Sequence, residues 1–593
     1  MAGLSDIAAL AKILWRVAAW RESATIVVYL LRSPIPLLRL WLGKLIIDSL
    51  VTGQNGPDLL HSELMRLLLA LVGTAIVSEI LERAANILEL SLGGTLETTL
   101  TMRVMQHACN LDLIQLEDPN VSDAIDRLRR LTGNRLIIQS SVFGVLQETV
   151  ILASLAGAIM LKSISLELLL MTSVAPMLFA DLRNTRHAYA IRRHRTPERR
   201  LLDYIRQLVI SGQSFKEIHV LGLGGHIVAL YERLSQRLLK EEELIASRRT
   251  LFSLLSKMVS IAAYYIAYVV VVQRVISGNS SVGEFTFLTG ALARSRGTIE
   301  NIASYITAMD SQLLSLRDLF AFFELTPEVK CDEMAIPAPR PIRGGLEFVN
   351  VSFLYPGKLD PVLKNVNFYI PIGQKVALLG QNGAGKSTIV KLVARLYDPT
   401  SGQILLDGID IRKYDIRDLH EQISIVFQDF VRYNLSARDN VGFGNVHEIR
   451  NDVLLDAAAR KSGARLLIDR FPGGYDQILG RRFAGGVDLS GGEWQTFALA
   501  RGYMRNAQIL ILDEPTAALD PIAERQMFDG FSRFAKGRLA IVVSHRLSTA
   551  RTADRILVLA EGSVREDGTH DELMASGGLY ARLFDLQASA YCR

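Results

Sequence analysis

Cysteine is scarce in this chain of 593 residues, which contains only three. Cys109, Cys331 and Cys592 are odd in number and none has CxxC spacing, so neither a disulfide framework nor a zinc site is predicted. The first residues also lack a basic stretch followed by a short apolar run and a small-residue cleavage site. We therefore expect an amphipathic cytoplasmic lead-in there and no signal peptide.

The chain also has little excess charge of either sign, because its 66 Lys and Arg residues nearly balance its 61 Asp and Glu residues. The net charge of +5 is more typical of Lys and Arg beside membrane helices than of nucleic-acid binding, so no nucleic-acid partner is expected. Hydrophobic residues are abundant: they make up 49% of the chain and give a mean hydropathy of +0.22. These values are high for a soluble protein of this length, and the chain is longer than a single domain. The sequence predicts at least two domains, one of them in a membrane.

Six segments are apolar enough, in windows of about 19 residues, to be candidate membrane helices. They lie at roughly 24–50, 64–90, 137–161, 164–183, 251–276 and 283–310. The third and fifth are the strongest, and the third carries only Glu148 as a charged residue. The sixth contains Arg294, Arg296 and Glu300, which a helix facing lipid on all sides could hardly carry.

The connections between these segments differ in charge. Connections 51–63 and 276–282 have no Lys or Arg, whereas connections 98–136 and 184–250 are long and rich in arginine. This positive-inside asymmetry predicts a multi-pass protein of the inner or plasma membrane, embedded in the lipid bilayer with both termini in the cytoplasm. Without the asymmetry, the weaker segments would fit amphipathic core helices of a soluble domain.

Charged residues inside weak membrane segments are tolerated where they face a bundle interior or a water-filled cavity. We therefore expect the charges of the sixth segment to line such a cavity. For Arg32 and Arg39 of the first segment, a position near the interface with the charge reaching water fits equally well. Tyr264, Tyr265 and Tyr268 of the fifth segment fit either an amphipathic cavity or ordinary helix packing.

The composition changes near residue 325, where long apolar runs give way to proline-rich connectors and short strand-like runs separated by glycines. The sequence therefore predicts a transmembrane domain over 1–325, a linker over 326–344 and a second domain over 345–593. The expected fold class is multi-domain: an all-α transmembrane domain of six helices with two long cytoplasmic coupling regions, followed by an α/β P-loop domain.

The second domain contains a P-loop in the segment KVALLGQNGAGKSTIVKLV, in which an apolar strand, a glycine-rich turn and a helix follow one another. A phosphate chain needs many N–H donors at close range, and Gly383 and Gly385 keep side chains out of the way. Lys386 supplies a positive charge for the phosphates, and the Ser387 hydroxyl can bind Mg²⁺. The expected ATP-binding residues are Gly380, Gln381, Asn382, Gly383, Ala384, Gly385, Lys386, Ser387 and Thr388.

A second apolar strand, in QILILDEPTAALD, ends in two adjacent carboxylates. Successive side chains of a strand point in opposite directions, so the two acids are expected to have different roles. Asp513 suits Mg²⁺ binding, and Glu514 suits the general base that orients and deprotonates the attacking water. Without a P-loop in the same chain, an acid pair at a strand end would be an ordinary solvated feature.

Between these motifs stands LSGGE, about 100 residues after the P-loop and about 20 before the acidic strand. This order of motifs resembles that of the ABC ATPase family, in which LSGGE is the signature motif. The resemblance implies roles for residues elsewhere: an adenine-stacking aromatic at Tyr355, a glutamine at Gln428 that reaches Mg²⁺ and the attacking water, an acid at Asp520 and a γ-phosphate-contacting histidine at His545. His545 taken alone would more often be an ordinary core histidine.

The resemblance also implies a pair of chains. In this family the signature of one ATP-binding domain closes over the ATP that the P-loop of another domain holds. Ser490, Gly491 and Gly492 would then act on a partner's ATP, with the N-terminal end of the following helix facing the γ-phosphate. Because the motifs are intact, a homodimer is expected, although a different partner chain remains an alternative.

Six segments followed by one such domain resemble the exporter-type ABC half-transporter. The expected function is an ATPase that exports an amphipathic substrate, such as a peptide, a lipid or a drug-like molecule, from the cytoplasm by alternating access. The alternatives are a lipid flippase, an ATP-gated conduit and a soluble ABC ATPase that acts on nucleic acid. Trp494, where Arg or Lys is more common, and the segment 430–444 depart from the family pattern, and we expect them to alter contacts between domains and not hydrolysis.

Overall fold

The computed structural model describes residues 2–52, 63–118, 121, 125, 138–161, 164–165, 168–169, 172, 196–211, 214–277, 280–329, 334–514 and 521–591. The chain divides into two compact units. The first comprises residues 1–111 and 116–326, and the second comprises residues 112–115 and 327–593. The first unit is helical and the second is α/β, which is the predicted order of domains.

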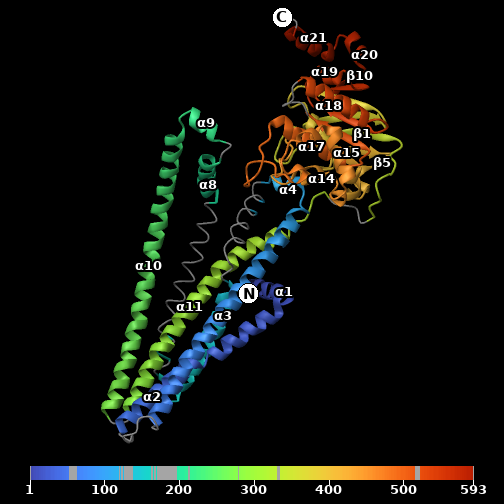
Figure 1. The fold of residues 1–593 in the computed structure, drawn as a ribbon. Helices are drawn as coiled ribbons and strands as arrows, with labels where there is room; N and C mark the ends of the chain where they lie inside the picture. Colours follow the sequence, from blue (N-terminus) through green and yellow to red (C-terminus); the bar gives the residue numbers. More distant parts are fainter. Residues whose placement is uncertain are drawn as a thin grey trace. The chain divides into compact units, whose positions relative to one another are not determined.

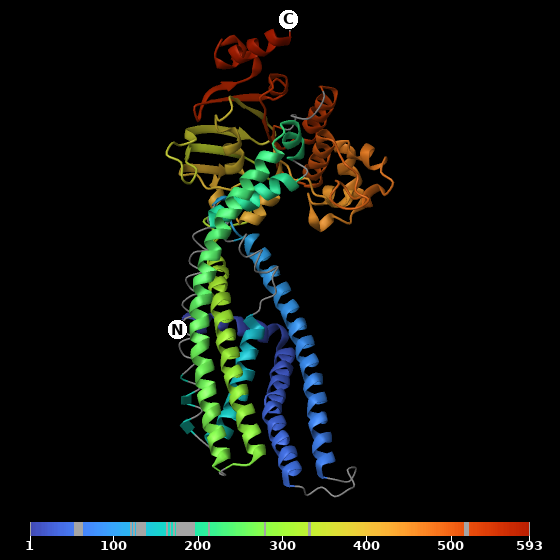
Figure 2. The ribbon, with the colours of Figure 1, turned by 90° about the vertical axis from the view of Figure 1, so that its left-hand side faces the viewer.

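The first unit is built from long helices, three of which are 46, 53 and 42 residues long. At 1.5 Å per residue these helices measure about 60–80 Å, so each is longer than the ~30 Å hydrocarbon core of a bilayer. Figures 1 and 2 show them as rods, with α10 and α11 side by side. The helices of this unit are α1 (Ala2–Arg32), α2 (Ile35–Thr52), α3 (Glu63–Ala108), α6 (Ile138–Met160), α8 (Thr196–Ile210), α9 (Phe215–Val220), α10 (Gly224–Ile276) and α11 (Val282–Phe323).

Four helical segments among the described residues are long and apolar enough to cross a membrane, namely Ala18–Val51, Glu63–Ala108, Ser140–Met160 and Lys257–Ile276. They coincide with the first, second, third and fifth predicted segments. The fourth predicted segment lies largely outside the described residues. The sixth predicted segment lies within α11, and its charged residues keep it from being recognised as a membrane helix by composition alone.

The first predicted segment is not one continuous helix. Helix α1 ends at Arg32, and α2 begins at Ile35, after Ser33 and Pro34. Proline disfavours helical backbone in the residue before it, which explains the break at this position. Arg32 donates to Glu82 of α3 across 2.6 Å, so its charge is paired with an acid of a neighbouring helix.

The second unit contains two sheets. A four-stranded antiparallel sheet has the order β2-β1-β4-β5, and a six-stranded sheet has the order β10-β9-β3-β8-β7-β6, in which only β10 is antiparallel. Strands β7 and β8 are buried along their whole length, as expected of central parallel strands covered on both faces. The strands are β1 (Gly345–Phe353), β2 (Leu363–Pro371), β3 (Lys375–Gly380), β4 (Ser401–Leu406), β5 (Ile409–Asp410), β6 (Ile423–Val426), β7 (Ile509–Asp513), β8 (Leu539–Val543), β9 (Arg555–Ala560) and β10 (Ser563–Gly568).

Helices cover the parallel sheet of the second unit. Its α-helices are α12 (Lys386–Val393), α13 (Ile416–Glu421), α14 (Ala437–Gly442), α15 (Asp452–Ser462), α16 (Ala464–Ile468), α17 (Gly491–Met504), α18 (Pro521–Phe534), α19 (Leu547–Ala550), α20 (His570–Ala575) and α21 (Leu579–Tyr591). Its short 3-10 turns are η2 (Ile411–Lys413), η3 (Val446–Glu448) and η4 (Gly474–Asp476). Helix α4 (Leu113–Glu117) begins in the short segment of residues 112–115 that belongs to this unit.

The segment 112–115 is attached to the second unit by its side chains. The Asp112 carboxylate accepts a hydrogen bond from the Val329 amide across 2.7 Å. Leu113 and Ile114 pack against the main hydrophobic core of the unit. This segment lies within connection 98–136, one of the two long connections that the sequence predicts to be cytoplasmic coupling regions.

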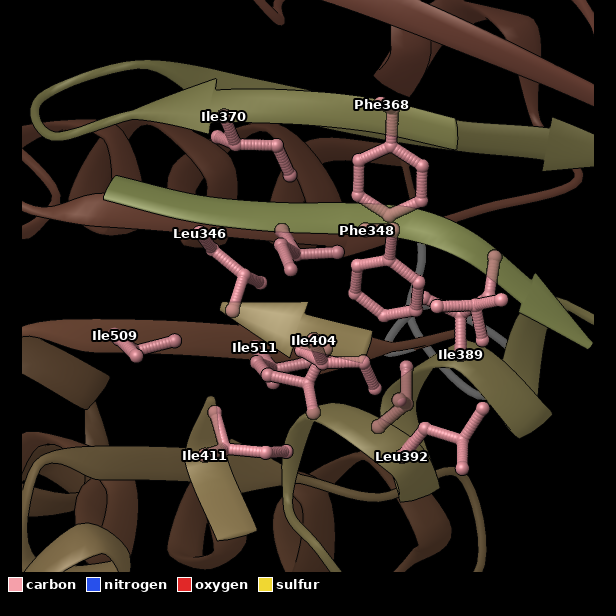
Figure 3. Close-up of a cluster of buried hydrophobic side chains, with 14 of the residues drawn as sticks. Leu346, Phe348, Phe368, Ile370, Ile389, Leu392, Ile404, Ile411, Ile509 and Ile511 are labelled. Carbon is pink, nitrogen blue, oxygen red and sulfur yellow. The ribbon is translucent and has the colours of Figure 1, made fainter. Parts of the chain in front are cut away.

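One hydrophobic core joins the two sheets of the second unit. Figure 3 shows side chains of β1, β2, β4, α12 and β7 pointing into a common interior. The rings of Phe348 and Phe368 stack there with centroids 4.4 Å apart. Ile509 and Ile511 enter the same core from β7, the strand that carries the predicted catalytic acids. Packing in this core therefore positions those acids.

We expect Ile511→Ala to destabilise the second unit by about 2–5 kcal/mol, because it leaves a cavity at a side chain that is 1% exposed. Hydrogen exchange of the β7 amides in the full-length chain, in lipid nanodiscs, measures this loss. The matched control is Ile409→Ala in β5, at the rim of the antiparallel sheet, which should change the opening free energy by less than about 1 kcal/mol. Equal protection of β7 in the Ile511 variant and the parent would contradict this account of the core.

Candidate functional site

The P-loop connects β3 to α12 and depends on glycine at defined positions. Gly380 and Gly385 have φ values of +155° and +102°. A Cβ atom at Gly380 would lie 2.4 Å from the Leu559 carbonyl oxygen, and one at Gly385 would lie 2.5 Å from a methyl group of Leu363. Glycine is therefore required here both by conformation and by space. Gln381, Asn382 and Gly383 form an exposed rim, from which a ligand can reach the loop amides.

Lys386 is the first residue of α12 and is buried beneath this rim. Its ammonium donates to the carbonyl oxygens of Gly380 at 2.8 Å and Gln381 at 3.1 Å. Burial lowers the pKa of Lys386, and the nearby carboxylates of Asp513 and Glu514 oppose that effect. The positive charge is thus held against the loop, where the P-loop motif predicts the phosphates.

Asp513 is the last residue of β7, and its side chain is almost fully buried. Burial, together with the neighbouring charge of Glu514, raises the pKa of this carboxyl to about 6, although the Ser387 hydroxyl and Lys386 act in the opposite direction. Its Oδ1 atom has no hydrogen-bond partner among the described residues. A buried carboxylate oxygen without a partner, beside a serine hydroxyl, fits a hard cation such as Mg²⁺, which prefers oxygen ligands.

Glu514 follows β7 and adopts a left-handed backbone conformation, with a φ of +44°. Its amide donates to the Val543 carbonyl oxygen at 3.0 Å, which holds the turn against β8. Strand alternation predicts opposite directions for the two acids, but the strand ends at Asp513 and the turn directs Glu514. Left-handed backbone in a residue other than glycine is strained and is frequent at functional sites.

Two side chains from other segments converge on the Glu514 carboxylate. Gln428 Nε2 donates to Glu514 Oε2 at 2.9 Å, and His545 Nδ1 lies 3.4 Å from the same oxygen. Gln428 follows β6, and His545 follows β8, the two strands that flank β7. Parallel strands end at the same edge of a sheet, which explains why three residues distant in sequence meet here.

Tyr355 lies beside the P-loop helix. Its hydroxyl is 3.2 Å from Thr388 Oγ1, and its ring makes edge contacts with Phe353 and Tyr397 at centroid distances of 4.9 and 5.4 Å. The Lys391 ammonium lies 5.5 Å from the ring centroid. The aromatic side chain is therefore fixed next to the loop, while its contact with adenine stays a prediction.

The signature serine caps helix α17. Ser490 Oγ accepts from the Glu493 amide at 3.3 Å, and the Ser490 amide donates to the Glu493 carboxylate at 2.7 Å, so the two residues form a capping box. Ser490 is exposed, and Gly491 and Gly492 are half-buried. Among the described residues, no hydrogen bond or ion pair joins Ser490 to the P-loop or to Glu514 of the same chain. Asp520, also predicted to act at this site, lies outside the described residues.

Trp494 and the segment 430–444, which depart from the family pattern, are integrated into the fold around α17. Trp494 is buried in the core formed by α14 to α18. Arg501 of α17 donates to the carbonyl oxygens of Val431 at 2.8 Å and Asn440 at 3.1 Å, and its guanidinium lies 4.8 Å from the Tyr433 ring centroid.

Arg501 is not among the residues predicted from the sequence, and its contacts tie the segment after Gln428 to the signature helix. Burial lowers the pKa of its guanidinium. The residues that Arg501 contacts lie far from it along the chain. The only sign of these contacts in the sequence is that segment 430–444 departs from the family pattern.

Comparison with known proteins identifies the second unit. Residues 363–517 match the ABC transporter family. The subtilin transport ATP-binding protein SpaT of Bacillus subtilis is 29% identical over 551 residues, covering 93% of this chain and 89% of that protein. An ATP-dependent lipid A-core flippase of Haemophilus ducreyi is 30% identical over 509 residues, covering 84% of each chain.

The likeness extends through the first unit as well. The solved structure of a bacterial Atm1-family ABC exporter with ATP bound is 25% identical, with a TM-score of 0.79, and the match covers 97% of this chain and 99% of the exporter. The predicted fold class, ATPase activity and exporter function are confirmed by this agreement, which decides against the soluble ATPase alternative. The chain therefore belongs to the ABC transporter family, as an exporter-type half-transporter in which a multi-pass helical membrane domain precedes an ATP-binding domain.

Proposed function

We propose that two copies of this chain form an exporter that hydrolyses MgATP and moves an amphipathic substrate out of the cytoplasm by alternating access. The observation that carries this proposal is the convergence of Gln428 and His545 on the Glu514 carboxylate, in a chain with membrane-length helices. In this proposal residues 1–325 form the transmembrane domain, 326–344 the linker and 345–593 the ATP-binding domain. The ATP-binding domain faces the cytoplasm from the inner or plasma membrane.

ATP would be bound by the loop from Gly380 to Thr388. The exposed rim of the loop presents backbone amides, and the start of α12 adds its helix dipole. Lys386, now bonded to two loop carbonyl oxygens, is placed to exchange them for phosphate oxygens. Tyr355 would stack on the adenine.

Asp513 and the Ser387 hydroxyl, with Gln428, would hold Mg²⁺. The unpaired Oδ1 of Asp513 and its raised pKa support this assignment, since a cation would stabilise the buried charge. When bound, the ion would stabilise the negative charge that develops on the phosphate oxygens during phosphoryl transfer.

Glu514 would act as the general base. Its carboxylate, held by Gln428, would accept a proton from the water that attacks the γ-phosphate. Gln428 and His545 are positioned to orient the water and the γ-phosphate, because both already lie within 3.4 Å of the carboxylate. The strained backbone at Glu514 supports this role, since such a conformation is retained where it aims a side chain.

Each ATP site would be completed by a second copy of the chain. Ser490, Gly491 and Gly492 lie at the exposed start of α17, and they make no polar contact with the P-loop of their own chain among the described residues. A symmetric pair would place each signature on the partner's ATP, with Asp520 nearby. All the motifs fit the working pattern, which favours a homodimer with two competent sites.

Binding of ATP would drive the transport cycle through differential affinity. A ligand shifts a conformational equilibrium only as far as it binds one state better than the other. ATP held between two copies satisfies this condition, because the open form lacks the signature contacts. The attachment of segment 112–115 to the second unit through Asp112, Leu113 and Ile114 supports its role in transmitting closure to the membrane helices.

A lipid flippase is the second candidate, and the relatives favour keeping it. The Haemophilus relative is named a lipid A-core flippase, whereas the Bacillus relative is named a subtilin transport protein. One name specifies a lipid and the other specifies subtilin, so a lipid flippase stays a candidate beside an exporter of peptides or drug-like molecules.

We expect Glu514→Gln to lower steady-state ATPase activity by at least about 100-fold, because the amide cannot accept the proton from water. ATP binding, followed with a fluorescent ATP analogue, should persist, since the nucleotide is held by the P-loop. The matched control is Glu561→Gln, an exposed acid between β9 and β10, which should retain the parent rate. A Glu514→Gln protein with the parent rate would refute the base assignment.

Two inactive variants should complement each other if the sites form between chains. Lys386→Ala removes the P-loop charge, and Ser490→Arg blocks the signature. In a mixed dimer one site carries both defects and the other is intact, so a 1:1 mixture should recover about a quarter of the parent ATPase activity. A mixture as inactive as either variant alone would show that each chain builds its own site.

The Mg²⁺ requirement should become pH-dependent below about pH 6. A folded-state pKa of about 6 for Asp513 means that protons compete with Mg²⁺ below this pH, whereas an ordinary aspartyl group would compete only near pH 4. We expect the Mg²⁺ concentration for half-maximal binding of ATP to rise about tenfold between pH 7 and pH 5. Because Asp513→Asn cannot titrate, this variant should bind weakly with little pH dependence. A flat profile in the parent would contradict the Mg²⁺ role of Asp513.

A further inference from the structure

Glu148 is the only charged residue in the membrane-length segment Ser140–Met160 of helix α6. It lies eight residues beyond Ser140, about 12 Å along the helix at 1.5 Å per residue. If this segment crosses the bilayer, the carboxylate lies within the ~30 Å hydrocarbon core. The residue is only 7% exposed, so it faces the bundle and not lipid. Ionisable residues in such positions are rare and usually functional.

The two carboxylate oxygens of Glu148 have different surroundings. Oε1 accepts a hydrogen bond from Asn301 Nδ2 of α11 at 2.9 Å. An Arg294 guanidinium nitrogen lies 3.9 Å from the same oxygen, too far for a hydrogen bond. Oε2 is buried and has no hydrogen-bond partner among the described residues. A buried, unpartnered carboxylate oxygen is unfavourable, so a ligand that donates to it would bind favourably.

The packing of α6 against α11 keeps Glu148 in place. One helical turn before Glu148, the ring of Tyr305 rests on Gly144, where a Cβ atom would lie 2.6 Å from the ring. Ile151, Leu155 and Ile159, farther along α6, belong to a fully buried cluster with residues of α11. Close packing of α6 against α11 therefore fixes the backbone around Glu148 between these two helices.

Two cationic groups of the neighbouring helix regions already have anionic partners. Arg32 pairs with Glu82 at 2.6 Å, and Arg296 pairs with Glu300 at 2.9 Å and lies over the Tyr264 ring at 5.9 Å. At Glu148 itself, the atom that lacks a hydrogen-bond partner among the described residues is the carboxylate oxygen Oε2. Charge complementarity favours a cationic ligand over an anionic one.

An aromatic cluster near Arg296 supplies apolar surface in the same helices. Tyr264 contacts Tyr265 and Tyr268 with ring centroids 5.3 and 6.3 Å apart, and Tyr268 contacts Phe285 of α11 at 5.7 Å. An acid together with aromatic rings suits a molecule with an ammonium group and an apolar body.

We propose that Glu148 is the recognition carboxylate of an intramembrane binding site, which takes the ammonium group of an amphiphilic cargo at Oε2 while Asn301 holds Oε1. This inference rests on the proposed export function and narrows its cargo to cationic amphiphiles. Asn301 is a positioning residue, because it acts through the carboxylate. A purely structural Glu148, bridging α6 and α11 for stability, is the competing account.

The test measures equilibrium binding of radiolabelled dodecylamine, which is protonated at neutral pH, to the full-length chain in phosphatidylcholine nanodiscs. Uncharged dodecanamide of the same chain length serves as the matched ligand, and nanodiscs without protein give the lipid background. We expect Glu148→Gln to raise the Kd of dodecylamine at least about tenfold and to leave the Kd of dodecanamide unchanged, because only the ammonium needs the carboxylate. Glu148→Asp, which keeps the charge, should restore part of the preference for dodecylamine.

The control variant is Glu79→Gln, which removes an acid of α3 whose side chain is 61% exposed and pairs with Arg83. It should leave both Kd values unchanged. Equal shifts for the two ligands in Glu148→Gln, no shift for dodecylamine, or no rescue by Glu148→Asp would each overturn the inference in favour of a structural role.

A further arm identifies the source of the ammonium group. If the cargo is an aminolipid, phosphatidylethanolamine should compete with dodecylamine. Replacing phosphatidylcholine by phosphatidylethanolamine should then raise the apparent Kd of dodecylamine in the parent but not in Glu148→Gln. An unchanged Kd in the parent supports a free amphiphile. ATP hydrolysis by the same nanodiscs separates the two proposals. If the protein hydrolyses ATP but its binding of dodecylamine does not depend on Glu148, only this inference is refuted. If the parent protein does not hydrolyse ATP, the proposed function is refuted.

Discussion

A triphosphate must be surrounded by backbone N–H groups at close range, and the ATP-binding domain is organised around this constraint. The loop between β3 and α12 meets it by placing Gly380 and Gly385 where a Cβ atom would collide with Leu559 or Leu363. The constraint reaches further than the loop, because Leu559 lies on β9, which pairs with β3, and Leu363 is the first residue of β2. Parallel pairing then brings the ends of β6, β7 and β8 to one edge, where Gln428, Glu514 and His545 meet.

Much of this site could be predicted from the sequence, because its parts are local. The strand, glycine turn and helix around Lys386 are contiguous, and the acidic end of β7 is visible as an apolar run followed by Asp513 and Glu514. The direction of Glu514 could not be predicted, because it depends on a positive φ and on a hydrogen bond to Val543 of a neighbouring strand. Strand alternation, a local rule, therefore gave a wrong reason for the separation of the two acids.

The membrane domain was less predictable for the same physical reason. Hydropathy finds helices that face lipid, so it located the apolar segments of α3, α6 and α10. It cannot judge α11, where Arg296 pairs with Glu300 of the same helix and Arg294 lies 3.9 Å from Glu148 of α6. The break between Arg32 and Ile35 is local and follows from Pro34, but the pair of Arg32 and Glu82 joins helices far apart in sequence. Contacts of this kind become visible only when the helices are packed.

The charged side chains of the membrane domain differ in whether all their polar atoms have partners, and this difference has a thermodynamic consequence. Arg32 with Glu82 is a closed pair, and breaking it would leave two charges unpaired. Glu148 is partly satisfied, because Asn301 occupies one oxygen and leaves the other without a partner. A rearrangement of α6 against α11 would change the access to that oxygen, since Gly144 and Tyr305 hold the two helices together one turn away. A cargo that supplies the missing donor must therefore bind one arrangement of these helices better than the other, and by this differential affinity it shifts the equilibrium that ATP also shifts.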